Sequence, residues 1–314
     1  MYEVGGVGMY RLVSWHKWQN TLLCGLVAVL VAFGIGETAV TRYRAAATSA
    51  AVRNEETVFL PIIMYHGVLN DSTRQGQYVI SPAMLESDLA YIRAQGYETV
   101  LVQDLIDYVD NGKPLPEKSI MLTFDDGYYN NYLYAYPLLQ EYGMKAVISP
   151  VCKWTAFYSD TPSESDHAIY SHITWQEMRE MVDSGLVEIQ NHSYDMHYCV
   201  AGKRKGTLKR AAETVEQYQT ALREDLSAAQ AYLTELVGVT PSAFVYPFGA
   251  MCDEALPIIK ALGFRATLTC ESRINRITRQ ADSLMGMGRY LRPHGTDSAV
   301  YFDRIFAAVD KAKK

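Results

Sequence analysis

The chain has 314 residues, of which 49% are hydrophobic and 20% are charged, and its formal net charge at pH 7 is −6. This composition is ample for a hydrophobic core and offers no basic surface for nucleic acid. Five cysteines in a chain of this length do not predict a disulfide framework, and without a Cys-x-x-Cys spacing a structural zinc site is not expected either.

Near the N-terminus, residues 18–36 carry no formal charge and are rich in Leu, Val, Ala and Gly. About 20 apolar residues span a bilayer, so this segment predicts a short transmembrane anchor. A cleaved signal peptide is the alternative, with small residues at 45–51 near a possible cut. Because those residues lie well past the apolar run, we favour an uncleaved anchor between a cytoplasmic N-terminus (1–17) and a linker (37–56).

From residue 57 onward, short β-rich runs alternate with amphipathic helical stretches. The expected strands are 59–65, 99–102, 119–124, 145–150, 187–191, 242–247 and 266–270. The expected helices are 81–95, 130–142, 174–184 and 207–237. This order predicts one α/β domain over residues 57–314 with a parallel sheet, and polar residues at successive strand ends predict a barrel. The least regular segment, 153–172, is expected to be a long loop that either walls a binding groove or is merely exposed.

Two carboxylates follow one of the expected strands directly. The hydrophobic run 120–124 ends on Asp125 and Asp126, with Gly127 behind them. Neighbouring side chains at a strand end diverge onto different faces, so one carboxylate can bind a metal while the other faces a substrate. The alternative is a simple turn, since Asp-Gly is a strong turn signal.

Histidines follow other expected strands. The run 187–191 leads into His192 and, five residues later, His197. Two imidazoles and a carboxylate are usual ligands of an open catalytic zinc site. Tyr246-Pro247-Phe248 forms a third strand exit, and His294 ends the segment Leu-Arg-Pro-His. Each histidine alone is more often an ordinary loop residue, but their joint occurrence at successive strand ends favours a site.

Together these four segments resemble the polysaccharide deacetylase family, the NodB-like carbohydrate esterases that remove N- or O-acetyl groups from sugars. The resemblance covers roughly residues 60–294 and implies a distorted (β/α)7 TIM-like barrel. Residues 123–127, Thr-Phe-Asp-Asp-Gly, match the first family motif, which implies that Asp125 is the catalytic base and Asp126 a metal ligand. His192 opens the second motif. Its five-residue spacing to His197 resembles the branch that deacetylates poly-N-acetylglucosamine, which implies that His197 is the other imidazole ligand.

The chain departs from the family pattern in the later motifs. The third motif usually has an arginine two residues before its proline, where this chain has Val245, and no Asp-x-x-Asp-Trp segment corresponds to the fourth motif. The resemblance still implies that the backbone N–H of Phe248 faces the oxyanion. His294 aligns with the last motif, Leu-x-His, with one extra residue, which implies a general acid.

Further residues are implied as substrate contacts: His66, Tyr246, Pro247 and Tyr194. For His66, a structural hydrogen bond is an equal alternative. The pair Tyr194-Asp195 could orient an imidazole through a carboxylate, as groups behind metal ligands often do, and a solvated loop is the alternative.

The resemblance implies a metal-dependent N-deacetylase of N-acetylglucosamine units in a bacterial surface polysaccharide. Its cofactor would be a divalent metal, Zn²⁺ first, with Co²⁺, Ni²⁺ or Fe²⁺ accepted by the same ligands. Because such a glycan is extracellular, we expect a single-pass protein of the cell membrane with the catalytic domain outside, or a secreted protein if the leader is cleaved. An O-acetyl sugar esterase and a catalytically silent glycan-binding relative are the alternatives.

Overall fold

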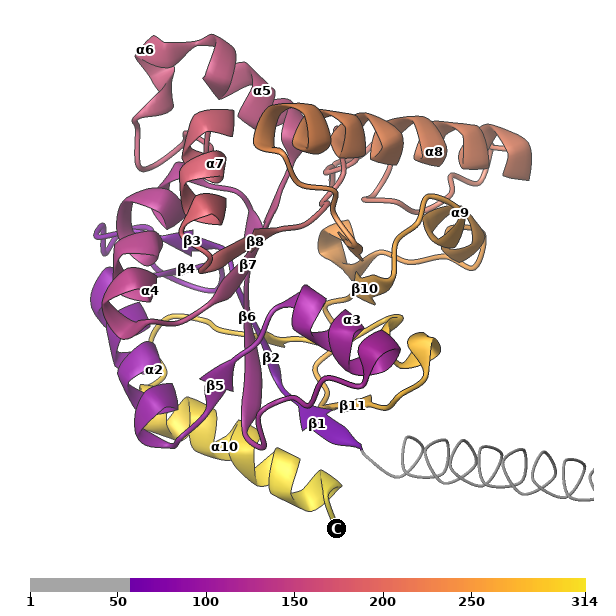
Figure 1. Cartoon of the computed structure of the whole chain (residues 1–314). Helices are drawn as coiled ribbons and strands as arrows, with labels where there is room; N and C mark the ends of the chain where they lie inside the picture. Colours follow the sequence, from indigo (N-terminus) through magenta and orange to yellow (C-terminus); the bar gives the residue numbers. More distant parts are fainter. Residues whose placement is uncertain (1–56) are drawn as a thin grey trace, which may run out of the picture. The chain divides into compact units, whose positions relative to one another are not determined.

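The computed structural model describes residues 57–314 (Figure 1). The predicted N-terminus, anchor and linker (1–17, 18–36 and 37–56) lie outside the described residues. Within 57–314, no helix is both long and apolar enough to span a bilayer.

A parallel sheet forms the centre of the described region. Its path is β12 (Tyr290–Leu291), β2 (Ile62–Tyr65), β6 (Ser119–Asp126), β7 (Ala146–Pro150) and β8 (Val187–Ile189), with β5 (Glu98–Thr99) also paired to β6. The other pairs are β9 (Ala243–Val245) with β10 (Ala266–Leu268), β3 (Gly67–Val68) with β4 (Val79–Ile80), and antiparallel β1 (Val58–Leu60) with β11 (Asn275–Ile277).

Single bridges continue this path beyond the main sheet. Asn191, just after β8, pairs with Phe244 of β9, and Leu268 of β10 pairs with Met287, just before β12. The predicted α/β fold with parallel strands is therefore confirmed. The strand ladders form separate sheets rather than one closed sheet, so the seven-stranded barrel stays a prediction.

Helices cover the sheet, and Figure 1 shows α2, α4 and α7 in a row along one side of it. The helices are α2 (Pro82–Ala94), α3 (Val102–Asn111), α4 (Tyr136–Tyr142), α5 (Cys152–Asp160), α6 (Pro162–Ser165), α7 (Trp175–Asp183), α8 (Val215–Tyr232), α9 (Leu256–Ala261) and α10 (Ser298–Ala312). Short helical turns cover 131–135, 233–237, 247–249 and 281–284.

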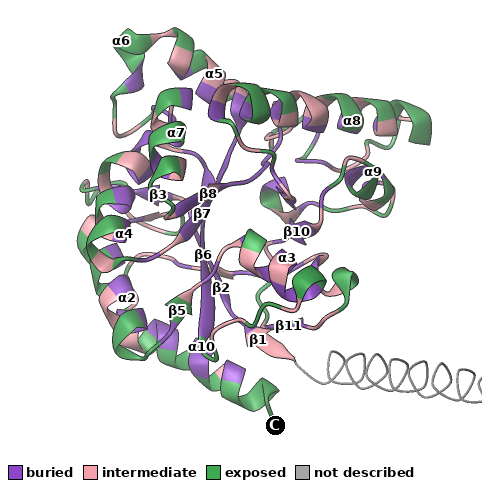
Figure 2. Cartoon of the chain, viewed as in Figure 1, coloured by how far each residue is buried: buried purple, intermediate pink, exposed green. Residues whose placement is uncertain are grey.

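The alternation of side chains along β6 divides the core and positions the site. Leu122 and Phe124 join the apolar cluster that packs against α2, α4, α7 and α10, whereas Met121 joins a second cluster shared with β9 and β10. Figure 2 shows the central strands buried, and every residue of β6 is buried. Because side chains alternate across a strand, Asp125 lies on the same face as Met121, toward the second cluster.

Three predicted elements differ from the structure. The segment 153–172 is not one long loop, because it contains α5 and α6, the latter started by Pro162. The helix expected from residue 207 begins only at Val215, because the side chain of Thr214 caps it by accepting the N–H of Gln217. The strand expected at 99–102 ends at Thr99, and α3 starts at residue 102.

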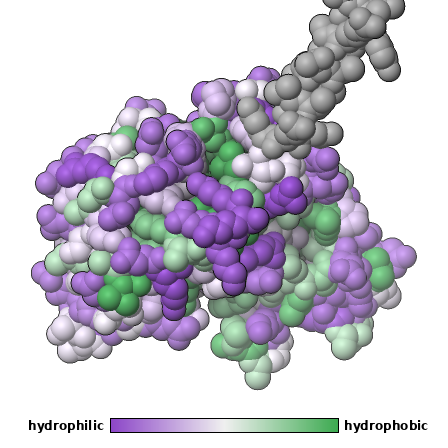
Figure 3. Space-filling model, turned by 90° about the horizontal axis from the view of Figure 1, so that it is seen from below, coloured by the Kyte–Doolittle hydropathy of each residue, from purple (hydrophilic) through white to green (hydrophobic). Residues whose placement is uncertain are grey.

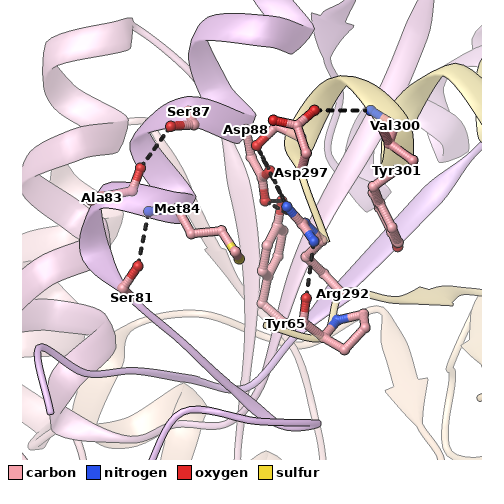
Figure 4. Close-up of polar contacts among 12 residues, drawn as sticks. Tyr65, Ser81, Ala83, Met84, Ser87, Asp88, Arg292, Asp297, Val300 and Tyr301 are labelled. Atoms are coloured by element: carbon pink, nitrogen blue, oxygen red, sulfur yellow. Dashed lines mark hydrogen bonds and ion pairs between the residues drawn. The ribbon is translucent and has the colours of Figure 1, made fainter. Parts of the chain in front are cut away.

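A buried ionic cluster connects the C-terminal ends of β2 and β12 with α2 and α10 (Figure 4). Arg292, directly after β12, makes two hydrogen bonds of 2.9 and 2.8 Å to the carboxylate of Asp88 in α2. Ser298 at the start of α10 and Tyr65 of β2 also donate to this carboxylate, at 2.6 and 3.1 Å. Both members of the ion pair are fully buried, so the cluster joins β2, α2, β12 and α10 in one arrangement.

The surface is of mixed character. On the face shown in Figure 3, hydrophilic and hydrophobic residues are intermixed, and the hydrophobic ones form several separate groups. Elsewhere, large aromatic side chains on and after α5 are exposed.

Candidate active site

The turn after β6 separates the two carboxylates. Asp126 has a positive φ of 71°, and Gly127 follows with a φ of 69°. A Cβ at Gly127 would lie 2.8 Å from the Cβ of Pro150, so only glycine fits there. Within the described region, the non-glycine residues with positive φ are Asp126, Ser193 and Phe248, and all three lie in the segments that carry predicted site residues. Such backbone conformations cost energy and cluster at functional sites.

Asp126, His192 and His197 form a potential metal site. Nε2 of His197 and Nε2 of His192 lie 3.1 and 3.6 Å from Oδ1 of Asp126. One ligand atom from each residue lies within 4.8 Å of the others. The three predicted ligands, one from the end of β6 and two from the segment after β8, are thus brought together.

The surroundings of these atoms fit a divalent cation. Nδ1 of His192 lies 2.8 Å from the carbonyl oxygen of Val245, and a proton on Nδ1 would leave a lone pair on Nε2, toward Asp126. Oδ1 of Asp126 is buried and has no hydrogen-bond partner among the described residues. Burial acts to raise the pKa of Asp126, but the imidazoles of His192 and His197 hold that pKa well below its usual range. A cation would satisfy the buried oxygen and both nitrogen lone pairs.

Asp125 is paired with an arginine that the sequence motifs did not indicate. Nη1 and Nη2 of Arg289 donate to its two carboxylate oxygens at 2.7 and 2.8 Å. Nε of Arg289 donates to the carbonyl oxygen of Thr269 at 2.8 Å, and the arginine side chain is fully buried. Burial acts to raise the pKa of Asp125, but the charge of Arg289 lowers it overall. Arg289 therefore supplies the guanidinium that is absent at position 245.

A cavity of about 1070 Å³ opens over these groups. Asp125, Asp126, His192, His197 and Phe248 all line it, which is the position expected for a base, three metal ligands and a backbone donor. This volume is sufficient for a sugar and its acetyl group.

His66 lies in the wall of the same cavity. Its Nδ1 is buried without a hydrogen-bond partner among the described residues, and its ring centroid lies 5.0 Å from that of Tyr78. Burial lowers the pKa of His66. The structure therefore places this predicted substrate contact in the same cavity as Asp125 and Asp126.

The other predicted site residues lie elsewhere. His294 is not among the described residues that line the cavity, and its backbone N–H donates to the carbonyl oxygen of Gly76 at 2.9 Å. Tyr246 and Pro247 are buried and are not among the described residues that line the cavity. The ring of Tyr194 lies outside the cavity and stacks on that of Tyr232, with centroids 5.4 Å apart.

Asp195 does not contact an imidazole. Its carboxylate accepts from Nζ of Lys153 at 2.7 Å and from the hydroxyl of Tyr198 at 2.6 Å. Instead, the carbonyl of Val245 orients the His192 ring. The segment after His192 is held by Asp225, which accepts the N–H groups of Tyr194 and Asp195 at 2.9 and 2.8 Å.

Sequence reasoning missed Arg289 and two tyrosines of the cavity wall, Tyr78 and Tyr128. Tyr128 lies two residues beyond Asp126. The pKa of its hydroxyl is raised, mainly because the group is buried and secondly because the negative charge of Asp126 is near. Its nearness to the Asp-Asp-Gly motif could have drawn attention to it. No comparable local signal marks Arg289.

Comparison with known proteins agrees with this geometry. A family model described as polysaccharide deacetylase matches residues 112–267. The poly-beta-1,6-N-acetyl-D-glucosamine N-deacetylase of Escherichia coli strain K12 is 32% identical in an alignment of 241 residues, which covers 71% of this chain and 35% of that protein. The chain thus spans about a third of the length of this curated relative.

Solved structures of similar proteins match most of this chain. A de-N-acetylase from Aggregatibacter actinomycetemcomitans is 30% identical with a TM-score of 0.65, covering 79% of this chain and 100% of that one. IcaB from Ammonifex degensii is 26% identical with a TM-score of 0.64, covering 80% and 97%. The chain belongs to the polysaccharide deacetylase family, and the predicted resemblance is confirmed.

Proposed function

We propose that this protein is a metal-dependent deacetylase that hydrolyses the N-acetyl groups of N-acetylglucosamine units in a bacterial surface polysaccharide. The observation that carries the proposal is the pairing of Asp125 with Arg289 directly beside the Asp126, His192 and His197 cluster, in one cavity. Amide hydrolysis needs a base, a stabilised oxyanion and a proton for the amine, and each has a side chain or backbone group here.

Asp126, His192 and His197 would hold a divalent metal. When bound, this metal supplies Lewis-acid polarisation of the acetyl carbonyl and lowers the pKa of water to about 7. An Asp-His-His donor set suits Zn²⁺, which we propose as the native ion, and also accepts Co²⁺, Ni²⁺ or Fe²⁺.

Asp125 removes the proton of the attacking water in this proposal. Arg289 keeps its pKa low, so Asp125 is an anion at neutral pH and can accept that proton. The bidentate contact also fixes the carboxylate plane, so that one geometry is presented to the water. The backbone N–H of Phe248, in the cavity wall, donates to the developing oxyanion.

We assign the proton for the leaving amine to His66 in preference to His294. His66 lines the cavity with Asp125, whereas His294 does not. Nδ1 of His66 and Nδ1 of His294 both lack a hydrogen-bond partner among the described residues, so the position in the cavity decides the assignment.

For the polymer, we propose poly-β-1,6-N-acetylglucosamine. The E. coli relative is named for this substrate, and the five-residue spacing of His192 and His197 resembles the same branch. We also propose that residues 18–36 anchor the protein and that residues 57–314 face the outside of the cell. Protease digestion of intact cells, followed by detection of the catalytic region, tests this topology.

Acetate release by the purified full chain tests the activity. N-acetylglucosamine oligomers with β-1,6 and β-1,4 linkages are compared with added zinc, with chelator, and with the Asp125→Asn variant. We expect metal-dependent release that is highest for β-1,6 oligomers and absent in the variant. Metal binding without acetate from either linkage would favour an O-acetyl sugar esterase, if acetylated xylan is hydrolysed, or a silent glycan-binding relative if it is not.

A further inference from the structure

An exposed group of aromatic side chains lies on and after α5. Trp154, Phe157 and Tyr170 are 40, 48 and 45% exposed. Trp154 and Phe157 are three residues apart in the helix and so share one face of it. We call these three residues the α5 platform. Large exposed aromatic side chains on one face of a helix, such as Trp154 and Phe157, are candidates for a binding surface.

The α5 platform is tied to the loop that carries the metal ligands. The first backbone N–H groups of α5, those of Cys152 and Lys153, donate to the carbonyl oxygens of Ser193 and Tyr194 at 3.2 and 3.0 Å. These acceptors directly follow His192 in the sequence. The position of α5 (Figure 1) is therefore fixed relative to the catalytic loop.

Ring contacts connect the α5 platform with the wall of the catalytic cavity. The ring of Trp154 stacks on that of His172, with centroids 5.9 Å apart. His172 pairs through its backbone with Tyr128, and their rings lie 4.9 Å apart. Tyr128 lines the cavity beside Asp126. The ring contacts therefore run from Tyr128 in the cavity wall through His172 to Trp154.

The polar groups near the α5 platform fit a sugar chain. Aromatic faces suit the apolar faces of sugar rings, whereas the hydroxyls of Tyr and the N–H of Trp suit their polar edges.

The charges nearby distinguish between possible occupants. Asp160, Glu164 and Asp166 are exposed in the segment between Trp154 and Tyr170. Lys153, the basic residue at the start of α5, is already paired with Asp195. These three carboxylates repel nucleic acids and anionic lipids, and they attract the ammonium groups of a partly deacetylated glycan.

We propose that the α5 platform is a second glycan subsite, which holds the part of the chain beyond the sugar in the cavity and favours segments whose acetyl groups have already been removed. This inference rests on the proposed deacetylase function. Chains long enough to reach the α5 platform would then be hydrolysed more efficiently than shorter ones.

The experiment compares Trp154→Ala and Phe157→Ala with the wild-type full chain, using β-1,6 N-acetylglucosamine dimer and hexamer. Trp154→Tyr keeps an aromatic face, and Leu133→Ala removes an exposed apolar side chain from a different helix. We expect KM for the hexamer to rise about tenfold in Trp154→Ala. The kcat for the hexamer and the kinetics of the dimer should stay at the wild-type values, and Trp154→Tyr and Leu133→Ala should behave as wild type.

A binding measurement separates this inference from the proposed activity. Calorimetric titration of Asp125→Asn with a half-deacetylated hexamer, with and without Trp154→Ala, reports the α5 platform without turnover. A Kd about tenfold weaker in the double variant supports the subsite even if no acetate is released by the wild type. Equal hexamer affinities, or a loss of activity that is the same for dimer and hexamer, would overturn the subsite while leaving the deacetylase proposal standing.

Discussion

Arg289 and Asp125 are separated by 164 residues and meet in a buried bidentate pair, with hydrogen bonds of 2.7 and 2.8 Å. Side-chain alternation explains the meeting. Asp125 shares a face of β6 with Met121, and Arg289 shares a face of its own segment with Met287; both methionines belong to the same apolar cluster. Asp125, the proposed base, is therefore held by an arginine that the packing of the sheet brings to it and not by a residue of a neighbouring sequence motif.

Removing this guanidinium should abolish most of the activity. In Arg289→Met, Asp125 would be buried without its counter-charge, its pKa would rise, and the base would be protonated at neutral pH. We expect kcat to fall about 100-fold or more, with a smaller loss in Arg289→Lys, which keeps the charge but not the bidentate contact. Steady-state acetate release with a melting curve for each variant checks this.

The matched control is Arg265→Met. Arg265 makes a similar bidentate pair with Asp110, at 2.8 and 2.8 Å, but this pair is exposed to solvent. Its loss should leave kcat unchanged. A folded Arg289→Met protein with wild-type kcat would show that Asp125 needs no arginine.

The parts of the site that could be predicted from the sequence are those encoded by short local patterns. Asp125 and Asp126 end a strand whose apolar run is continuous, and His192 follows another, so the geometry of strand ends brings them together. Arg289 could not be predicted in this way, because its segment does not read as a strand. A Cβ at Gly288 would lie 2.4 Å from the carbonyl oxygen of Glu271, so close packing selects a glycine that interrupts the strand pattern.

A similar limit applies to the segments between strands. The aromatic and acidic composition of 153–172 predicts a loop, but α5 forms there because tertiary contacts with the residues after His192 satisfy its first N–H groups. Local propensity does not report contacts of this kind. The pairing of Arg292 with Asp88, 204 residues away, is hidden for the same reason.

Metal binding should depend on all three proposed ligands. Asp126→Ala and His197→Ala would each remove one of three converging ligand atoms. We expect the affinity for Zn²⁺ to fall by at least about 100-fold, since even groups behind the ligands contribute 10 to 100-fold. Calorimetric titration of chelator-treated protein measures this, with His167→Ala, an exposed histidine, as the control. Equal affinity in His197→Ala would place the ion elsewhere.

The choice between His66 and His294 as proton donor can be decided by the leaving group. An amine must be protonated as it departs, whereas an aryloxide leaves without help. His66→Ala should therefore lower kcat on N-acetylglucosamine oligomers about 100-fold and change hydrolysis of an aryl acetate much less. His294→Ala, outside the cavity, should leave both reactions near wild type. The reverse pattern would return the role to His294.

The buried pair of Asp88 and Arg292 should be important for stability. In Asp88→Asn, the fully buried guanidinium of Arg292 would lose its counter-charge. We expect a loss of about 3–5 kcal/mol in the free energy of unfolding. Asp110→Asn, which breaks the exposed pair with Arg265, should cost less than about 1 kcal/mol. Urea titration of both variants measures the difference, and equal losses would mean that the buried cluster adds nothing beyond a surface ion pair.

Glu188 of β8 should make stability depend on pH. Burial raises its pKa to about 7, although the backbone N–H of Gln103 and the side-chain amide of Gln190 donate to its carboxylate. Because the folded protein binds this proton more tightly than the unfolded chain, the contribution of Glu188 is fully present below about pH 4.5 and is lost as the pH rises through 7. The variant Glu188→Gln has no such titration. Its Tm relative to wild type should therefore increase by a few degrees between pH 5 and pH 8. A constant difference for Glu188→Gln would mean that Glu188 ionises with the same pKa in the folded and unfolded states.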